Sequence, residues 1–387
     1  DNGTTWVNKT TVNGLGHNTV YGVYAAGSNI YAATLSGLSI STNSGTTWVN
    51  KTTTNGLGST TVNGVYASGS TIYAATGGGL SISTDNGATW VNMTTSNGLG
   101  SNTIRGVYAS GSTIYAATGG GLSISTDNGI TWVNKTTTDG LGSNTVTGVY
   151  ASGSTIYAAT TGGLSISTDN GTTWVNKIAS NGLGSTTVNG VYASGSTIYA
   201  ATAGGLSIST DSGTTWANKT TANGLGSTTV NGVYASGSTI YAATAGGLSI
   251  STDSGTTWVN KTTSNGLGSN NVYGFYVSGS TIYAATGGGL SISTDSGTTW
   301  VNKTTTNGLG NNYVYGVYAA GSTIYAATNG GGLSISTDNG ATWVNKTTAA
   351  NGLGSNVIHG VSMHPVLLFM RQPAGDYRSL STTVLHL

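Results

Sequence analysis

Tryptophan recurs along this chain at an almost constant spacing. Of the gaps between successive tryptophans, seven are 42 residues long and one is 43, the extra residue being a glycine in the run Asn329-Gly330-Gly331-Gly332. A period of about 40 to 45 residues made of short strands is typical of β-propeller blades. Helical repeats of similar length need helix-length amphipathic stretches, and the chain has none. The tryptophans are Trp6, Trp48, Trp90, Trp132, Trp174, Trp216, Trp258, Trp300 and Trp343.

One repeat, residues 61–102, reads as four short strands separated by turn residues. The expected strands are Thr61–Ala67, Thr71–Thr76, Leu80–Ser83 and a fourth that begins near Thr89-Trp90-Val91, followed by a loop over residues 96–101. Repetition of this unit predicts an all-β propeller of four-stranded antiparallel blades in one domain, residues 1–361, with eight blades favoured. The alternative is a nine-blade propeller. Its last blade would combine residues 4–10, 355–361 and 366–370.

The segment before each repeated tryptophan follows the pattern Ser-x-Asp-x-Gly-x-Thr-Trp, and we name it the aspartate turn. The aspartate accepts bonds from the backbone N–H groups that follow, the glycine takes a positive φ, and the tryptophan packs on the sheet. We therefore expect a structural role for these residues. Trp48 follows Asn43 in place of the aspartate, and the aspartates are Asp85, Asp127, Asp169, Asp211, Asp253, Asp295 and Asp338.

The aspartate turns resemble the Asp-box, or bacterial neuraminidase repeat. The resemblance covers roughly residues 1–361 and implies the propeller fold shared by sialidases, some glycanases, sortilin-like receptors and photosystem assembly factors. It implies an extracellular or cell-surface location. It does not by itself imply an activity, because one fold hosts many functions.

Composition excludes several classes of function. Charged residues make up 5% of the chain, the net charge is +1 and cysteine is absent, which argues against nucleic-acid binding and thiolate chemistry. No apolar run is long enough to insert into a membrane. The histidines His17, His359, His364 and His386 do not cluster with carboxylates, so we expect no metal and no cofactor. The repeated Asn-Lys-Thr, as at Asn134, fits a glycosylation sequon and equally a polar strand end.

Acidic residues are too few and too regularly placed for glycoside hydrolysis. The chain has no glutamate and ten aspartates, most of them in the aspartate turns. A glycosidase needs two carboxylates about 5 to 10 Å apart, and turns 42 residues apart lie on separate blades. The sialidase resemblance also implies an arginine triad, whereas the only arginines are Arg105, Arg371 and Arg378. We expect no enzyme activity, with a glycoside hydrolase as the remote alternative.

The repeat pattern ends after Gly360-Val361. There the expected Tyr-Ala-Ser-Gly-Ser-Thr-Ile-Tyr-Ala-Ala-Thr is replaced by the eleven residues 363–373. Suitable codons for the expected peptide, read one nucleotide out of frame, give this observed segment. Residues 362–387 are therefore interpreted as a frameshifted ninth repeat, and we assign no function to them.

Variation between near-identical repeats is the remaining clue to function. In the first strand it concentrates at the single residue that lies between a Val or Ile and a Gly. It also occurs at turn positions such as Leu35, Gly77, Thr161, Ala203 and Asn329. First strands line the channel of a propeller, so we predict a noncatalytic module that binds a glycan or a protein at one channel mouth. A purely structural spacer is the alternative, and near-identical blades also predict domain-swapped self-association. The predicted ligand residues are Tyr21, Asn63, Arg105, Tyr273 and Tyr315.

Overall fold

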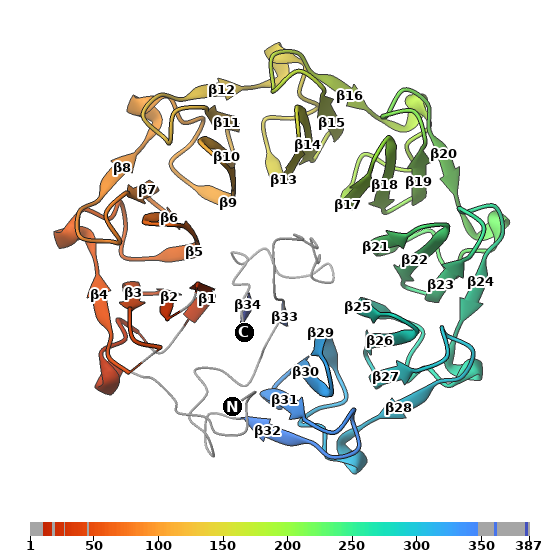
Figure 1. Cartoon of the computed structure of the whole chain (residues 1–387). Coiled ribbons are helices and arrows are strands. Elements are labelled where there is room, and N and C mark those ends of the chain that lie inside the picture. Colours follow the sequence, from red (N-terminus) through yellow and green to blue (C-terminus); the bar gives the residue numbers. More distant parts are fainter. Residues whose placement is uncertain are drawn as a thin grey trace. The chain divides into compact units, whose positions relative to one another are not determined.

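The computed structural model describes residues 11–17, 20–26, 28–44, 46–346, 360–361 and 384–385. Over these residues, eight antiparallel sheets of four strands follow one another along the chain (Figure 1). The predicted all-β propeller with eight blades is confirmed. Of the residues proposed for a ninth blade, the structure describes only β33 (Gly360–Val361), and of the proposed frameshifted tail only β34 (Val384–Leu385).

Each blade is built from four consecutive strands in chain order. The first strands are β1 (Val20–Ala26), β5 (Val62–Ser68), β9 (Ile104–Ser110), β13 (Val146–Ser152), β17 (Val188–Ser194), β21 (Val230–Ser236), β25 (Val272–Ser278) and β29 (Val314–Ala320). The second strands are β2 (Asn29–Thr34), β6 (Thr71–Thr76), β10 (Thr113–Thr118), β14 (Thr155–Thr160), β18 (Thr197–Thr202), β22 (Thr239–Thr244), β26 (Thr281–Thr286) and β30 (Thr323–Thr328).

The outer half of each blade is shorter. The third strands are β3 (Gly37–Ser41), β7 (Gly79–Ser83), β11 (Gly121–Ser125), β15 (Gly163–Ser167), β19 (Gly205–Ser209), β23 (Gly247–Ser251), β27 (Gly289–Ser293) and β31 (Leu333–Ser336). The fourth strands are β4 (Val49–Lys51), β8 (Val91–Met93), β12 (Val133–Lys135), β16 (Val175–Lys177), β20 (Ala217–Lys219), β24 (Val259–Lys261), β28 (Val301–Lys303) and β32 (Val344–Lys346).

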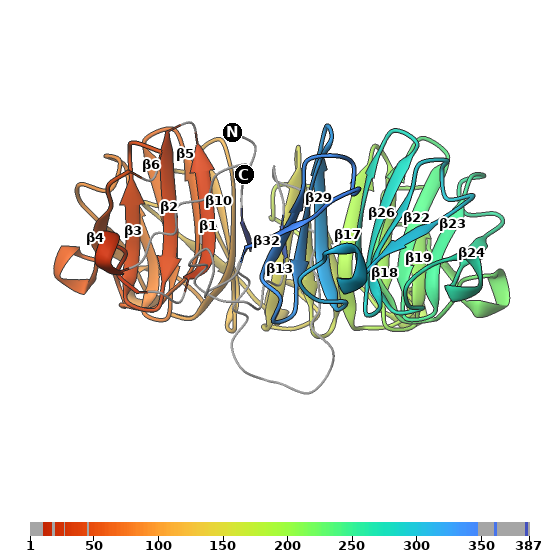
Figure 2. The same cartoon turned by 90° about the horizontal axis from the view of Figure 1, so that it is seen from below.

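The blades fall into two compact units that are described separately, blades 1–4 (β1–β16) and blades 5–8 (β17–β32). Within each unit the first strands of successive blades are neighbours, and the fourth strands lie at the opposite edge of each sheet (Figure 1). Consecutive strands of each blade are antiparallel, and the long axes of inner strands of this second unit, such as β17, β18, β22 and β26, are roughly aligned (Figure 2).

The strands predicted for residues 61–102 match the observed strands closely. Strand β6 has the predicted bounds, β5 is displaced by one residue, and β7 begins at Gly79. The fourth strand begins at Val91, so Trp90 precedes it. The predicted loop begins with a single 3-10 turn that the sequence analysis did not anticipate. These turns are η1 (Thr11–Asn13), η2 (Thr53–Asn55), η3 (Thr95–Asn97), η4 (Thr137–Asp139), η5 (Ala179–Asn181), η6 (Thr221–Asn223), η7 (Thr263–Asn265) and η8 (Thr305–Asn307).

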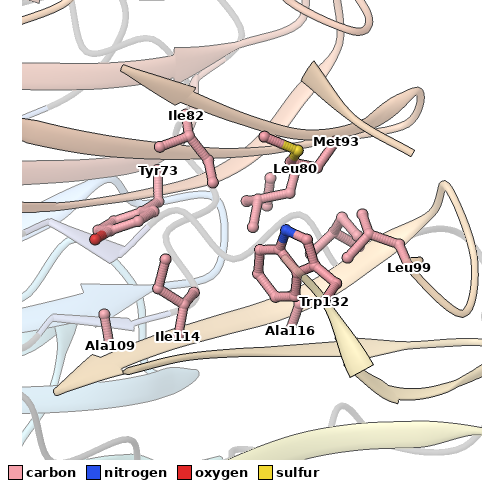
Figure 3. Close-up of a cluster of buried hydrophobic side chains, with 11 residues drawn as sticks. Tyr73, Leu80, Ile82, Met93, Leu99, Ala109, Ile114, Ala116 and Trp132 are labelled. Atoms are coloured by element: carbon pink, nitrogen blue, oxygen red, sulfur yellow. The ribbon is translucent and has the colours of Figure 1, made fainter. Parts of the chain in front are cut away.

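The apolar core lies between neighbouring sheets. One buried cluster joins Tyr73, Leu80 and Ile82 of blade 2 to Ile114 and Trp132 of blade 3 (Figure 3). Both faces of a sheet are covered in this way, so the second and third strands are buried along almost their whole length. The small side chains of the Ala-Ala pair in each second strand let the sheets approach closely.

The linker from one blade packs on the tryptophan of the next. Gly98 follows η3 with a φ of 100°, and a Cβ there would lie 2.8 Å from the Trp132 carbonyl oxygen. Only glycine combines this left-handed backbone with so close an approach. The following Leu99 is buried in the same cluster as Trp132 (Figure 3). Within each unit, a linker of this kind therefore fastens its own blade to the blade that follows.

A buried polar network holds the outer half of each blade. In blade 3, Ser123 Oγ accepts from Gly100 N at 3.0 Å and donates to Asn134 Oδ1 at 2.9 Å, while Asn134 Nδ2 donates to Gly120 O at 2.9 Å. Ser123 is fully buried, and burial without these bonds would be costly. The Asn134 side-chain amide is already hydrogen-bonded to Ser123 and Gly120. This geometry favours the interpretation of Asn-Lys-Thr as a polar strand end over its interpretation as a glycosylation sequon.

Candidate functional site

The variable residue of every blade lies at a β-bulge. In each first strand the pairing with the second strand shifts by one residue, as between Val62 and Gly64 in blade 2. The residue between them is therefore skipped in the register of the two strands, and a bulge of this kind redirects the side chain that it carries. These bulge residues are Tyr21, Asn63, Arg105, Thr147, Asn189, Asn231, Tyr273 and Tyr315.

The bulge and the aspartate turn lie at opposite ends of a blade. At the bulge end of blade 2, Gly77 N in the turn after β6 donates to Thr61 O, just before β5, at 3.4 Å. At the other end, Asn86 N in the aspartate turn donates to Ser70 O, in the turn after β5, at 2.9 Å. We name the first of these ends the bulge edge. It carries the bulge residue, the turn after the second strand and the linker into the first strand.

Two asparagines at the bulge edge are used to join blades. Asn189 Nδ2 donates to Val230 O, and Asn231 Nδ2 donates to Val272 O, both at 2.8 Å. Asn189 is only 5% exposed. In these two blades the side-chain amide is therefore engaged with the first strand of the next blade.

The predicted ligand residues in blades 1–3 differ in accessibility. Arg105 is exposed, and its guanidinium lies beside Gly119 in the turn after β10. Asn63 is half-buried. Tyr21 lies in β1, but its side chain is outside the described part of the structure. In blade 4, Thr147 Oγ1 donates to Ala159 O of the adjacent strand at 3.1 Å.

Tyr273 and Tyr315 of blades 7 and 8 are brought together, along with Tyr313. The Tyr273 and Tyr313 rings stack with centroids 4.9 Å apart, and Tyr315 meets Tyr313 edge-on at 5.0 Å. We name these three residues the tyrosine cluster. Sequence reasoning missed Tyr313, although it was visible as the single repeat in which tyrosine replaces Thr or Asn before the first strand.

Burial shapes the acid–base behaviour of the tyrosine cluster. Burial, followed by a hydrogen bond with Tyr313, raises the pKa of the Tyr273 phenol well above its ordinary value. Burial and the nearby Tyr313 also raise the pKa of Tyr315. Both phenols therefore stay protonated at physiological pH. They can donate as well as accept hydrogen bonds.

The aspartate turns use their carboxylates internally. Asp85 Oδ1 accepts from Ser83 Oγ at 2.7 Å and from Thr89 N at 2.9 Å, while Asp85 Oδ2 accepts from Thr89 Oγ1 at 2.6 Å. The Thr89 hydroxyl, then the Thr89 backbone N–H and Ser83, hold the pKa of Asp85 at about 2, below its usual 3.8. Such a carboxylate is a firmly ionised acceptor, unsuited to act as a general acid near neutral pH.

Within the residues that the structure describes, no three His, Cys, Asp or Glu side chains come together as a metal site would need. Among the same residues, no helix has the length and apolar character to cross a membrane.

The comparisons with known proteins identify the fold. The family model of the DUF6242 beta propeller domain matches residues 79–181 and 247–364, which is more than half of the chain. The computationally designed Ika8 protein is similar at a TM-score of 0.58 and 8% identity, covering 83% of this chain and 96% of its own. No curated protein matches.

Two natural proteins are similar at lower TM-scores. The extracellular domain of the putative hybrid two component system BT3049 from B. thetaiotaomicron matches at a TM-score of 0.43 and 16% identity, covering 92% of this chain and 68% of the other. YCF48 bound to D1 peptide matches at 0.43 and 17% identity, covering 66% of this chain and 86% of the other.

Proposed function

This chain belongs to the DUF6242 beta propeller domain family, and on that premise we propose that it is a noncatalytic binding module. Its ligand is a glycan or a protein, bound at the bulge edge. The observation that carries the proposal is the location of sequence change. Repeats that are otherwise nearly identical differ at the bulge residue, where Tyr, Asn, Arg and Thr replace one another.

The physical setting of the bulge residue supports a role in binding. Most of each blade is constrained, because the second and third strands are buried between sheets and the outer strands are held by the Ser–Asn network. A bulge residue stands outside the register of backbone pairing with the second strand, so a change of its side chain leaves that pairing intact. The first strands of neighbouring blades adjoin within each unit, so one ligand would touch several bulge residues and add their weak contacts.

The aspartate turns support the noncatalytic part of the proposal. We interpret them as Asp-boxes with a structural role, because the carboxylate of each is saturated by Ser and Thr of its own turn, as in Asp85. The resemblance to Asp-box proteins also underlies our proposal that the chain acts outside the cell or on its surface. No cofactor is required for such a role.

Array binding tests the proposal. The full chain would be screened on glycan and protein arrays beside a variant in which Tyr21, Arg105, Tyr273 and Tyr315 become asparagine, the residue found in blades 2, 5 and 6. A matched control changes Val259→Thr, which lies exposed on a fourth strand. We expect ligands that the wild type and the control retain and the bulge variant loses.

Salt and activity assays complete the test. Binding should change little with ionic strength, because Arg105 is the only charged bulge residue. Absence of any ligand would favour a structural spacer, and turnover in a hydrolase panel would favour an enzyme. Binding that survives in the bulge variant would place the ligand elsewhere on the molecule.

A further inference from the structure

Departures from the repeat concentrate at the bulge edge of blades 7 and 8. Tyr273 and Tyr315 are bulge residues, and Tyr313 stands where the other seven repeats have Thr or Asn. The single inserted glycine of the chain lies in the turn after β30, and Asn329 N at the start of this turn donates to Tyr313 O at 2.9 Å. Several independent sequence changes therefore meet at one place.

The three rings form a compact aromatic surface. Tyr273 and Tyr313 are inclined by 28°, Tyr313 and Tyr315 by 61°, and the Tyr273 and Tyr315 centroids are 6.1 Å apart. All three side chains are half-buried, so part of each remains accessible. The backbone of Tyr313 is fixed because its N–H donates to Asn311 Oδ1 at 2.8 Å. This anchoring limits the entropy lost when a ligand stacks on the rings.

The polar groups at the tyrosine cluster are neutral and include both donors and acceptors. The Tyr273 hydroxyl is hydrogen-bonded with Tyr313 and with the Asn271 amide. No charged residue occurs in segments 269–276, 311–318 or 329–332, which form the first strands and the enlarged turn here. An ionic ligand would lose hydration at this place without gaining a partner of opposite charge.

Resting on the proposed binding function, we infer that the tyrosine cluster is an anchoring subsite for a neutral glycan. A hexopyranose ring presents a flat face of C–H groups that suits stacking on a phenol ring, and its hydroxyls both donate and accept, as the phenols and the Asn271 amide do. A proline-rich peptide also stacks on aromatic rings. Its proline residues offer only backbone acceptors, which would leave the acceptors of the cluster unpaired.

The test is a titration of the full chain with four defined probes. Cellohexaose and mannohexaose are neutral, hexagalacturonic acid is the acidic counterpart, and decaproline represents the peptide. Binding is followed by calorimetry and by the tyrosine ring signals in NMR. The variants are Tyr313→Thr and Tyr315→Asn, which restore residues found in other repeats and so preserve the fold. Val259→Thr, which lies exposed on fourth strand β24 away from the bulge edge, is the control.

We expect at least one neutral hexasaccharide to bind. Its affinity should fall at least about fivefold in Tyr313→Thr and Tyr315→Asn, as the loss of an aromatic contact predicts, and change little in Val259→Thr. Failure of both neutral probes, or tighter binding of decaproline or of the acidic probe, would overturn the ligand class. Neutral-probe affinity that is unchanged in both cluster variants would overturn the subsite while leaving the proposed function intact.

Discussion

Exchange between aspartate and asparagine in the aspartate turns should control how the protein responds to acid. Blade 1 already carries the neutral form: Asn43 Oδ1 accepts from Thr47 N at 2.9 Å and from Ser41 Oγ at 3.0 Å, and Asn43 Nδ2 donates to Thr47 Oγ1 at 2.8 Å. The amide therefore reproduces the turn without a titrating group. Asp253→Asn and Asn43→Asp are complementary substitutions, one removing a carboxylate and the other adding one.

The size of the effect follows from the pKa of the turn carboxylate. In the folded chain the pKa of Asp253 lies at about 2, lowered from 3.8 chiefly by the Thr257 hydroxyl, then by its N–H and by Ser251. At pH 3 unfolding should therefore take up about 0.8 proton at this site. The stabilisation is present above about pH 4 and is lost as the pH falls through 2. Asp85, Asp127, Asp169, Asp211, Asp295 and Asp338 have the same lowered pKa.

Urea unfolding between pH 6 and pH 2.5 measures this linkage. The slope of the unfolding free energy against pH near pH 3 should decrease by about 0.8 proton equivalent in Asp253→Asn and increase by a similar amount in Asn43→Asp. NMR titration of the Asp253 carboxyl carbon gives the folded pKa directly. Equal slopes in wild type and both variants, or a carboxyl titrating near pH 4 in the folded chain, would refute the assignment of the turn hydrogen bonds as the cause.

Three further predictions concern stability and are measured by urea denaturation at neutral pH. Trp132→Ala should lower the free energy of unfolding by about 3 to 5 kcal/mol, since Trp132 is buried between blades. Trp216→Ala should lower it less, because Trp216 is only half-buried. Equal losses in the two variants would contradict the role of burial. Asn134→Ala should cost about 2 to 4 kcal/mol, because it leaves Ser123 and the Gly120 carbonyl without their partner, and faster hydrogen exchange at the Gly100 amide should accompany it. Ser254, with a φ of 57°, should gain about 0.5 kcal/mol on Ser254→Asn, because asparagine tolerates the left-handed region better, while Ser254→Ala should lose stability.

Much of the fold could be predicted because the repeat presents its pattern eight times. The turn residues around Thr71–Thr76 delimited that strand correctly. The alternation Leu80-Ser81-Ile82-Ser83 also gave a strand, but it did not reveal that both serines are buried. Alternation of polar and apolar residues usually indicates one solvated face. Here the polar face is buried as well. Ser81 is satisfied by Gly58 of the preceding linker and by Asn92, and Ser83 by Asp85 and Gly87 of its own aspartate turn.

The candidate site could be predicted only in part. Comparison of the repeats identified the bulge position from the sequence alone, because such a comparison needs no knowledge of how the strands pair. The bulge itself depends on the register with the second strand, and the contact of Asn189 with Val230 depends on how the next blade packs. Tyr313 was missed because tyrosine occurs at this position in one repeat only. Its contact with the Tyr273 ring depends on how two blades pack.

The linker that covers the tryptophan of the following blade has a consequence for how the chain folds. Gly98 and Leu99 reach Trp132 across about one repeat of sequence, and the core of Figure 3 likewise joins only adjacent repeats. Contacts of this range keep the loop-closure entropy of each step small. Folding can then nucleate in any adjacent pair of blades and grow outward by adding one blade at a time. Each added blade buries its tryptophan against the preceding linker. In a partly folded chain, apolar surface therefore stays exposed only on the first and last folded blades.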